Sequence, residues 1–292
     1  MKTISNTLEM TETNFTVNKL PLTAINPITW EQLDTQSFGI FRNDTGTWLG
    51  TVGNQYAAIQ NHELVEIMHN IQDKFNGDIK GGYLKDGSKV YYQLSLNDEF
   101  VANDTIKREI TLLNSHDGTS SIGFGSSNTV VICENTFYMA MRDLSKFRHT
   151  LSASDRLTFA VKEFEQALLL DLGLMDTYKK MSEIQVTKPI ISEIIEKIFN
   201  VKETTTINDI STRKVNQLKR FNDCLVNELE SHGATVWGLF NAVTYYTNHK
   251  EFANGKSVEN LMIGQGYKKN LTAFNILENF TNNNKKLVHS FA

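Results

Sequence analysis

The spacing of the apolar residues changes near Asn135, and this change constrains the fold more than any other feature of the chain. Before Asn135, short apolar stretches alternate with turns rich in Gly, Asn and Asp, a pattern typical of antiparallel strands. After it, apolar residues recur every three or four positions, as on an amphipathic helix. This order favours an α+β fold over a doubly wound sheet: an N-terminal β-meander or antiparallel sheet with packed helices, followed by an all-helical C-terminal part.

The two spacings predict the individual elements. Short strands between Phe38 and Ile59 form the meander, because the turns at 43–46 and 52–54 carry residues that accept positive φ. Asn61 is expected to be the N-cap of a helix over about 61–76. Further strands are expected near 80–84, 89–96, 107–113 and 128–134, and helices near 137–147, 155–172, 190–199, 215–229 and 234–248, with a solvated tail at 282–286.

Composition divides the chain into three parts. Residues 1–35 are polar and are interpreted as an N-terminal arm, 36–185 as an α+β core domain and 186–292 as a helical C-terminal region. Residues 1–200 hold 18 Lys and Arg against 25 Asp and Glu, whereas residues 201–292 hold 11 against 8. This asymmetry permits a basic surface in the C-terminal part but does not require nucleic acid as a partner.

Cysteine use and hydropathy indicate the compartment. Cys133 and Cys224 are too few for a disulfide framework and are interpreted as buried thiols in a reducing cytosol. No stretch approaches the ~20 apolar residues of a membrane span. The first 20 residues lack the apolar core of a signal peptide. We therefore expect a cytoplasmic protein without a membrane partner.

The most distinctive segment is the polar stretch 113–121, which directly follows an apolar strand. Asn114, Ser115, His116 and Asp117 lie there, at a strand end where binding and catalytic groups are often found. The structural alternative is a hairpin turn whose side chains cap their own backbone. The other histidines lack the spacing of metal ligands, and no phosphate loop or nucleophile motif occurs, so we predict no metal and no cofactor.

A basic segment follows that could contact phosphates. On a helix, Arg142, Lys146 and His149 would share one face, and Arg148 and Arg156 add positive charge nearby. The alternative is a solvated helix face with local ion pairs. Both interpretations stay open on the sequence alone.

Two further features have a binding and a structural interpretation. The basic run 213–220 is either a phosphate-binding surface or a solvated helix face. The aromatic residues Phe38, Phe41, Trp48 and Tyr56 are either a platform on which bases stack or part of the core, and the core is the favoured interpretation.

Six short motifs occur in order: Phe38-Gly-Ile-Phe-Arg42, Val52-Gly-Asn-Gln-Tyr56, Ile59-Gln-Asn61, Asn114-Ser-His-Asp-Gly118, Val131-Ile-Cys-Glu-Asn135 and Arg148-His-Thr150. Together they resemble a family of phage- and plasmid-carried proteins, a domain of unknown function, over about residues 36–175. The resemblance implies a mobile-element protein in a bacterial host cytosol, with a role in DNA replication or recombination. No catalytic residue carries over, because the family has no established activity.

In that context we predict a protein that binds single-stranded nucleic acid, with single-stranded DNA as the partner, for strand annealing or recombination. Phage annealing proteins are similar in placing a small β-meander before a helix and in forming rings or filaments, which implies a homo-oligomer. The predicted nucleic-acid-binding residues are Arg42, His116, Arg142, Lys146, Arg148, His149 and Arg156.

Two other functions stay open. A protein-interaction module, such as a host-defence antagonist or an oligomeric structural protein, would expose a large apolar patch, expected on the aromatic helix 234–248. A hydrolytic enzyme would be centred on the turn 114–118, with Cys133, Glu134 or His149 converging on it. The sequence favours a binding protein over an enzyme.

Overall fold

The computed structural model describes residues 12–119, 122–132, 134–140, 153–202, 204–206, 209–251 and 258–290. The chain forms two compact units. The first unit contains residues 1–97, 109–126 and 140–170, and the second contains residues 98–108, 127–139 and 171–292. The domain boundaries expected from composition stay a prediction.

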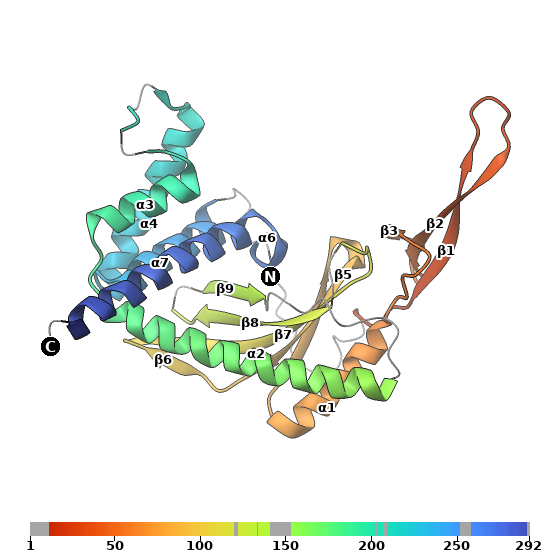
Figure 1. Ribbon diagram of the computed structural model, residues 1–292, viewed down its shortest axis with the longest axis horizontal. Helices are drawn as coiled ribbons and strands as arrows, with labels where there is room; N and C mark the ends of the chain where they lie inside the picture. Colours follow the sequence, from red (N-terminus) through yellow and green to blue (C-terminus); the bar gives the residue numbers. More distant parts are fainter. Residues whose placement is uncertain are drawn as a thin grey trace. The chain divides into compact units, whose positions relative to one another are not determined.

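A three-stranded antiparallel sheet opens the first unit. Its strands are β1 (Val17–Ile25), β2 (Gln32–Arg42) and β3 (Trp48–Val52), in the order β1-β2-β3 (Figure 1). Because β3 pairs only with residues 38–41 of β2, the sheet continues beyond it as a two-stranded hairpin, residues 22–37, called the arm from here on. Strand β1 lies in the segment interpreted from its polarity as an arm, and the strand prediction missed it.

Helix α1 (Asn61–Phe75) follows the small sheet. Its N-cap is Gln60 and not the expected Asn61: in a capping box, the Gln60 N–H donates to Glu63 Oε1 at 3.0 Å. Asn61 instead turns inward, because its buried side-chain amide donates to the Phe15 carbonyl oxygen at 3.1 Å.

The larger sheet has six strands and the order β4-β5-β7-β8-β9, with β6 paired to β7. Its strands are β4 (Ile79–Leu84), β5 (Lys89–Ser95), β6 (Glu99–Val101), β7 (Asp104–Ser115), β8 (Gly123–Val130) and β9 (Asn135–Ala140), with the short 3-10 helix η1 (Lys85–Gly87) between β4 and β5. The expected helix 137–147 is wrong where it overlaps β9. Phe137 and Met139 are buried and Tyr138 between them is not, which is the two-residue period of a strand.

In the described part of the chain, the elements after β9 are all helices, which confirms the expected α+β class (Figure 1). They are α2 (Ala153–Ser182), α3 (Lys188–Phe199), α4 (Thr212–His232), α5 (Val236–Tyr245), the π-helix η3 (Tyr246–Lys250), α6 (Val258–Ile263) and α7 (Gln265–Ser290). Helix α7 therefore includes residues 282–286, which the sequence analysis assigned to a tail. In the described part of the chain, no helix combines the length and the hydropathy needed to cross a membrane.

Each unit has its own core. In the first unit, α1 and the first half of α2 bury apolar side chains with β5 and β7, including Met68, Tyr92 and Phe164. In the second unit, Phe240 packs between Trp237 and Phe274, with ring centroids 6.1 and 5.9 Å away. These aromatic contacts hold α5 and α7 together.

Candidate functional site

The polar turn after β7 makes its hydrogen bonds internally. Asp117 Oδ1 accepts from Ser115 Oγ at 2.6 Å, from the Thr119 N–H at 2.9 Å and from Lys89 Nζ at 3.1 Å. Burial raises the pKa of Asp117, but the hydrogen bonds from Ser115 and Thr119 and the charge of Lys89 outweigh it and lower the pKa to about 2. The carboxylate is therefore ionised and held in place at neutral pH.

Lys89 is the cation of this turn, and it is buried, with 4% of its side chain exposed. Besides Asp117, its ammonium donates to Thr119 Oγ1 at 2.8 Å and to Ser115 Oγ at 3.1 Å. Tyr56 Oη donates to the Ser115 carbonyl oxygen at 2.8 Å. Because all three donors of an ammonium are used, Lys89 has none left for a substrate or a phosphate.

His116 faces the interior and is fully buried. Its Nε2 lies 2.9 Å from Asn61 Oδ1, its backbone N–H donates to the Ser88 carbonyl oxygen, and its ring centroid is 5.9 Å from that of Phe15. Burial lowers the pKa of His116 to about 4, against a smaller opposing effect of Asp117. At neutral pH this imidazole is uncharged and enclosed, so it does not contact a phosphate.

Arg42, the other predicted binding residue that the structure describes, is engaged as well. Its Nε and Nη2 bind the Asp44 carboxylate at 2.9 and 2.6 Å, and Nη1 donates to the Asp86 carbonyl oxygen at 3.0 Å. The guanidinium also stacks 3.9 Å from the Phe15 ring centroid. The hydrogen bonds and charge of Asp44 raise the pKa of Arg42. These contacts fix the base of β2 to η1.

The structure leaves the remaining predicted binding residues untested. Arg142, Lys146, Arg148 and His149 lie outside the described residues, as does Cys133, and the side chain of Arg156 does too. The described residues contain no group of three or more His, Cys, Asp or Glu side chains that could hold a metal ion.

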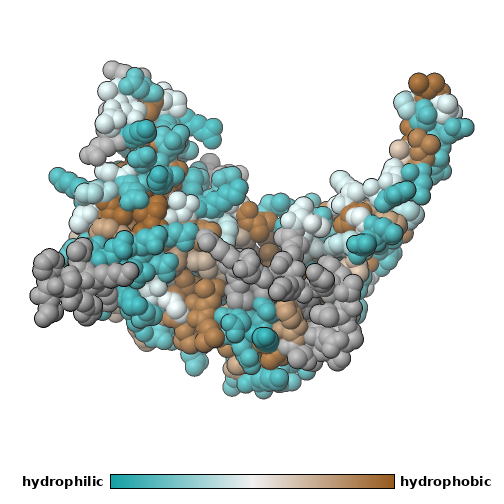
Figure 2. Space-filling view, in the orientation of Figure 1, coloured by the Kyte–Doolittle hydropathy of each residue, from teal (hydrophilic) through white to brown (hydrophobic). Residues whose placement is uncertain are grey.

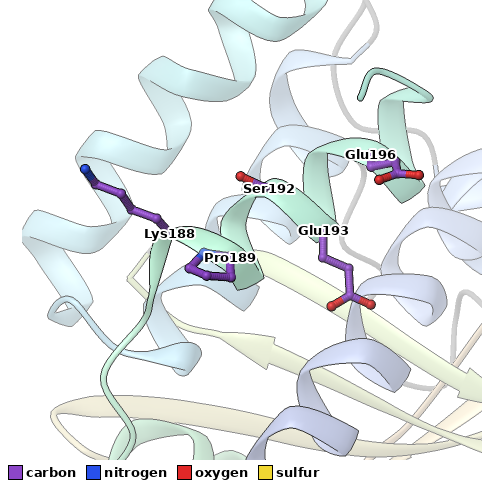
Figure 3. Close-up of a pocket in the computed structure, with 5 residues that line it drawn as sticks. All are labelled: Lys188, Pro189, Ser192, Glu193 and Glu196. Atoms are coloured by element: carbon purple, nitrogen blue, oxygen red, sulfur yellow. The ribbon is translucent and has the colours of Figure 1, made fainter. Parts of the chain in front are cut away.

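A pocket of about 310 Å³ lies along helix α3. All its lining residues come from this one helix: Lys188, Pro189, Ser192, Glu193 and Glu196. Figure 3 shows that the Lys188 ammonium and the Glu193 carboxylate point in different directions. Because ligand sites gather polar groups that converge, this open groove is not a persuasive binding site.

The exposed apolar patch that would mark a protein-interaction module is not on α5. Trp237 and Phe240 are each 2% exposed, which corrects the expectation for helix 234–248. Large exposed apolar side chains lie instead on the arm, where Ile28 is 86% and Trp30 is 78% exposed. In Figure 2, hydrophobic colouring covers the free end of the arm.

Hydrogen bonds of Asn26 define the turn at the tip of the arm. The Asn26 side-chain oxygen accepts the N–H groups of Ile28 and Thr29, and the Trp30 N–H donates to the Asn26 carbonyl oxygen at 2.9 Å. Trp30 has a φ of 59°, a left-handed conformation that is unusual for a bulky side chain. The sequence signal for this turn was the dipeptide Asn26-Pro27.

A domain of unknown function, DUF932, matches residues 48–272, which is well over half of the chain. The chain belongs to this family. No curated protein and no solved structure matches the chain. Membership carries no activity with it, so a functional argument depends on the residues described above.

Proposed function

We propose that the protein is a protein-interaction module whose arm docks on an apolar surface of another protein molecule. The observation that carries this proposal is the exposure of Ile28 and Trp30, 86% and 78%, at the end of a two-stranded hairpin. Adjacent large apolar side chains at a surface mark interaction sites, and Trp is enriched among the residues that dominate binding energy.

The structure of the tip supports this proposal. A left-handed Trp30 costs roughly 1–3 kcal/mol of backbone strain, and such strain persists where the surrounding structure holds it for function. The hydrogen bonds of Asn26 supply that restraint. Because these hydrogen bonds preform the turn, binding loses less conformational entropy there than it would in a turn without them.

The length of the arm leads to the same conclusion. No residue between Leu22 and Gln36 is buried. A two-stranded hairpin alone is marginally stable in water, so a hairpin with both faces exposed gains stability when a partner covers it.

Photo-crosslinking tests the proposal. A benzophenone amino acid would replace Ile28, and in a matched control it would replace Thr45, an exposed polar residue in the turn between β2 and β3. After illumination in cells that make the full chain, we expect defined protein adducts from position 28 and few from position 45. No adduct from position 28, or the same adducts from both positions, would contradict the proposal.

Binding of single-stranded nucleic acid is a second proposal, favoured by the basic run on α4. Arg213 and Lys219 are exposed there, and neither forms an ion pair within the described part of the chain. Anisotropy of a labelled single-stranded oligonucleotide at low and moderate salt tests it. Replacing both residues with Ala should weaken binding and reduce the salt slope by roughly 0.7 for each lost phosphate contact. Lys162→Ala, an exposed change on α2, is the control.

The cellular setting is also part of what we propose. A phage- or plasmid-borne origin in a bacterial cytosol fits both a protein-interaction module and a protein that binds single-stranded nucleic acid. The hydrolase alternative has less support, since His116 is buried and Asp117 binds Ser115 and Lys89 within the chain.

A further inference from the structure

One face of the small sheet is apolar and open to solvent. Residues that pair across strands share a face of the sheet, and so do residues two apart along a strand. By the pairing of β1 with β2 and β3, one such face, called the outer face, carries Leu20, Leu22, Ala24, Leu33, Phe41 and Trp48. Leu20, Leu33 and Trp48 are 48%, 47% and 58% exposed.

The packing around Gly39 supports the assignment of this face. A Cβ atom on Gly39 would lie 2.5 Å from Phe41 Cε2 and 3.1 Å from Leu22 Cδ2. The Phe41 ring and the Leu22 side chain therefore lie over the glycine, on the same side of the sheet. The opposite side is different at its base, because Ile40 and Val52 point into the core with 0% and 7% exposure.

We infer that the molecule covering the outer face is a second copy of this chain, packed outer face to outer face about a twofold axis. This inference rests on the proposed function and names its partner. The six side chains of the outer face are uncharged, and so are their cross-strand neighbours Asn18, Ser37 and Thr51. A twofold axis packs a surface against the same surface of the second copy. An uncharged face can pack in this way without like-charge repulsion.

The exposed area is of the size that a dimer needs. With ~200 Å² for a fully exposed large side chain, the outer face offers roughly 400–500 Å² of apolar surface per copy. Apolar atoms make up about 60% of a protein interface. The face therefore corresponds to roughly 700–800 Å² per copy, close to the ~800 Å² per partner of a standard interface. Two sheets packed in this way form a small β-sandwich, with the two outer faces in contact and the sheets about 10 Å apart.

Sedimentation velocity of the purified full chain over a range of concentrations tests the inference. We expect the dimer fraction to rise with concentration. Leu33→Asp should weaken dimerisation at least tenfold, because it buries a carboxylate in an apolar interface. Gln32→Asp adds the same charge on the neighbouring exposed residue, which faces the opposite side, and should leave dimerisation unchanged.

A second variant and a second signal distinguish a weakened interface from a misfolded chain. Leu20→Asp changes the outer face on β1 and should act as Leu33→Asp does, while circular dichroism stays that of the wild type. Tryptophan emission should shift to the blue as the dimer forms, because Trp48 would leave water whereas Trp237 is already buried within one chain. A wild-type chain that is monomeric at every concentration would overturn the inference, and so would equal dimerisation of the Leu33 and Gln32 variants.

The crosslinking experiment separates the two proposals. A monomeric chain whose position-28 adducts contain only other proteins would keep the proposed function and refute the second copy. A monomeric chain without any adduct at position 28 would refute both. Adducts of twice the chain mass, lost in Leu33→Asp, would support both.

Discussion

Replacing His116 with Gln tests whether the polar turn is a structural element, through the dependence of stability on pH. In the folded chain the pKa of His116 is lowered to about 4 by burial, whereas an unfolded His titrates near 6.5. Between these two values the unfolded chain binds more protons than the folded chain, so stability falls as pH falls. The stabilisation is complete above about pH 6.5 and is lost as the pH drops toward 4.

The size of the effect follows from the two pKa values. At pH 5 the unfolded His is nearly all protonated and the folded one is mostly neutral, so His116 by itself lowers the stability of the wild type by about 2 kcal/mol relative to pH 8. The carboxylate of Asp117 does not interfere. Its pKa is about 2 in the folded chain and about 4 in the unfolded chain, so its contribution to stability changes mainly below about pH 4. Other ionisable pairs, such as His232 with Asp104 and Glu228, are the same in both proteins, so the difference between wild type and His116→Gln reports on His116.

Urea unfolding at pH 8 and pH 5, followed by circular dichroism, measures this difference. Wild type should lose about 2 kcal/mol more than His116→Gln, which keeps a polar group facing Asn61 but cannot take up a proton. His62→Gln, an exposed change on α1, should keep the wild-type dependence. An equal loss in wild type and His116→Gln would refute the reasoning and would mean that water reaches the imidazole.

Three other substitutions, one of them paired with a control at an exposed site, test packing. Asp171→Ala removes the buried carboxylate that Arg108 binds at 2.6 Å, and only the more distant Glu99, at 3.8 Å, stays as its ion-pair partner. Unfolding should therefore become about 3 kcal/mol easier. Asp176→Ala, the control at an exposed pair, should change it by less than about 0.5 kcal/mol; urea unfolding measures both. Phe164→Ala should cost about 3–5 kcal/mol in the same assay, because the ring is fully buried. Gly50→Ala should cost about 1–3 kcal/mol by overpacking, because a Cβ atom there would lie 2.8 Å from Asp117 Cα. Hydrogen exchange of the β3 amides should become faster, and an unchanged exchange rate would contradict this contact.

The fold class could be predicted from the sequence because the apolar spacing changes once along the chain. The strand β5, which alternates Val90, Tyr92 and Leu94 inward, was predicted for this reason. The strand β1 was missed because both faces of its outer half are exposed, so burial imposes no alternation of apolar and polar residues there. Strand β9 was missed because its short apolar run fits a helix or a strand equally well, and only pairing in the sheet decides between them.

The candidate site could be predicted only in part. The turn 114–118 stood out by its polarity, but polarity does not tell whether hydrogen bonds are made to a ligand or within the chain. The structure supplies that information, because Lys89 reaches the turn from β5, and no spacing along the sequence brings residues 89 and 117 together. The exposed tip had no apolar periodicity to mark it. Its only local signal was the turn at Asn26-Pro27, which places a turn but does not say what the turn presents.

The polar turn and the arm are linked through the small sheet of the first unit. A Cβ atom on Gly50 of β3 would lie 2.8 Å from Cα of Asp117, so the sheet packs directly on the turn. Arg42 ties the base of β2 to the Asp86 carbonyl oxygen, and Tyr56 reaches the Ser115 carbonyl oxygen from the segment after β3. A hairpin that extends into solvent has a defined direction only if its base is fixed, and these contacts fix it. The polar residues that a sequence search selects for chemistry therefore have a mechanical part in the proposed function: they hold the base from which the arm presents Ile28 and Trp30 to a partner.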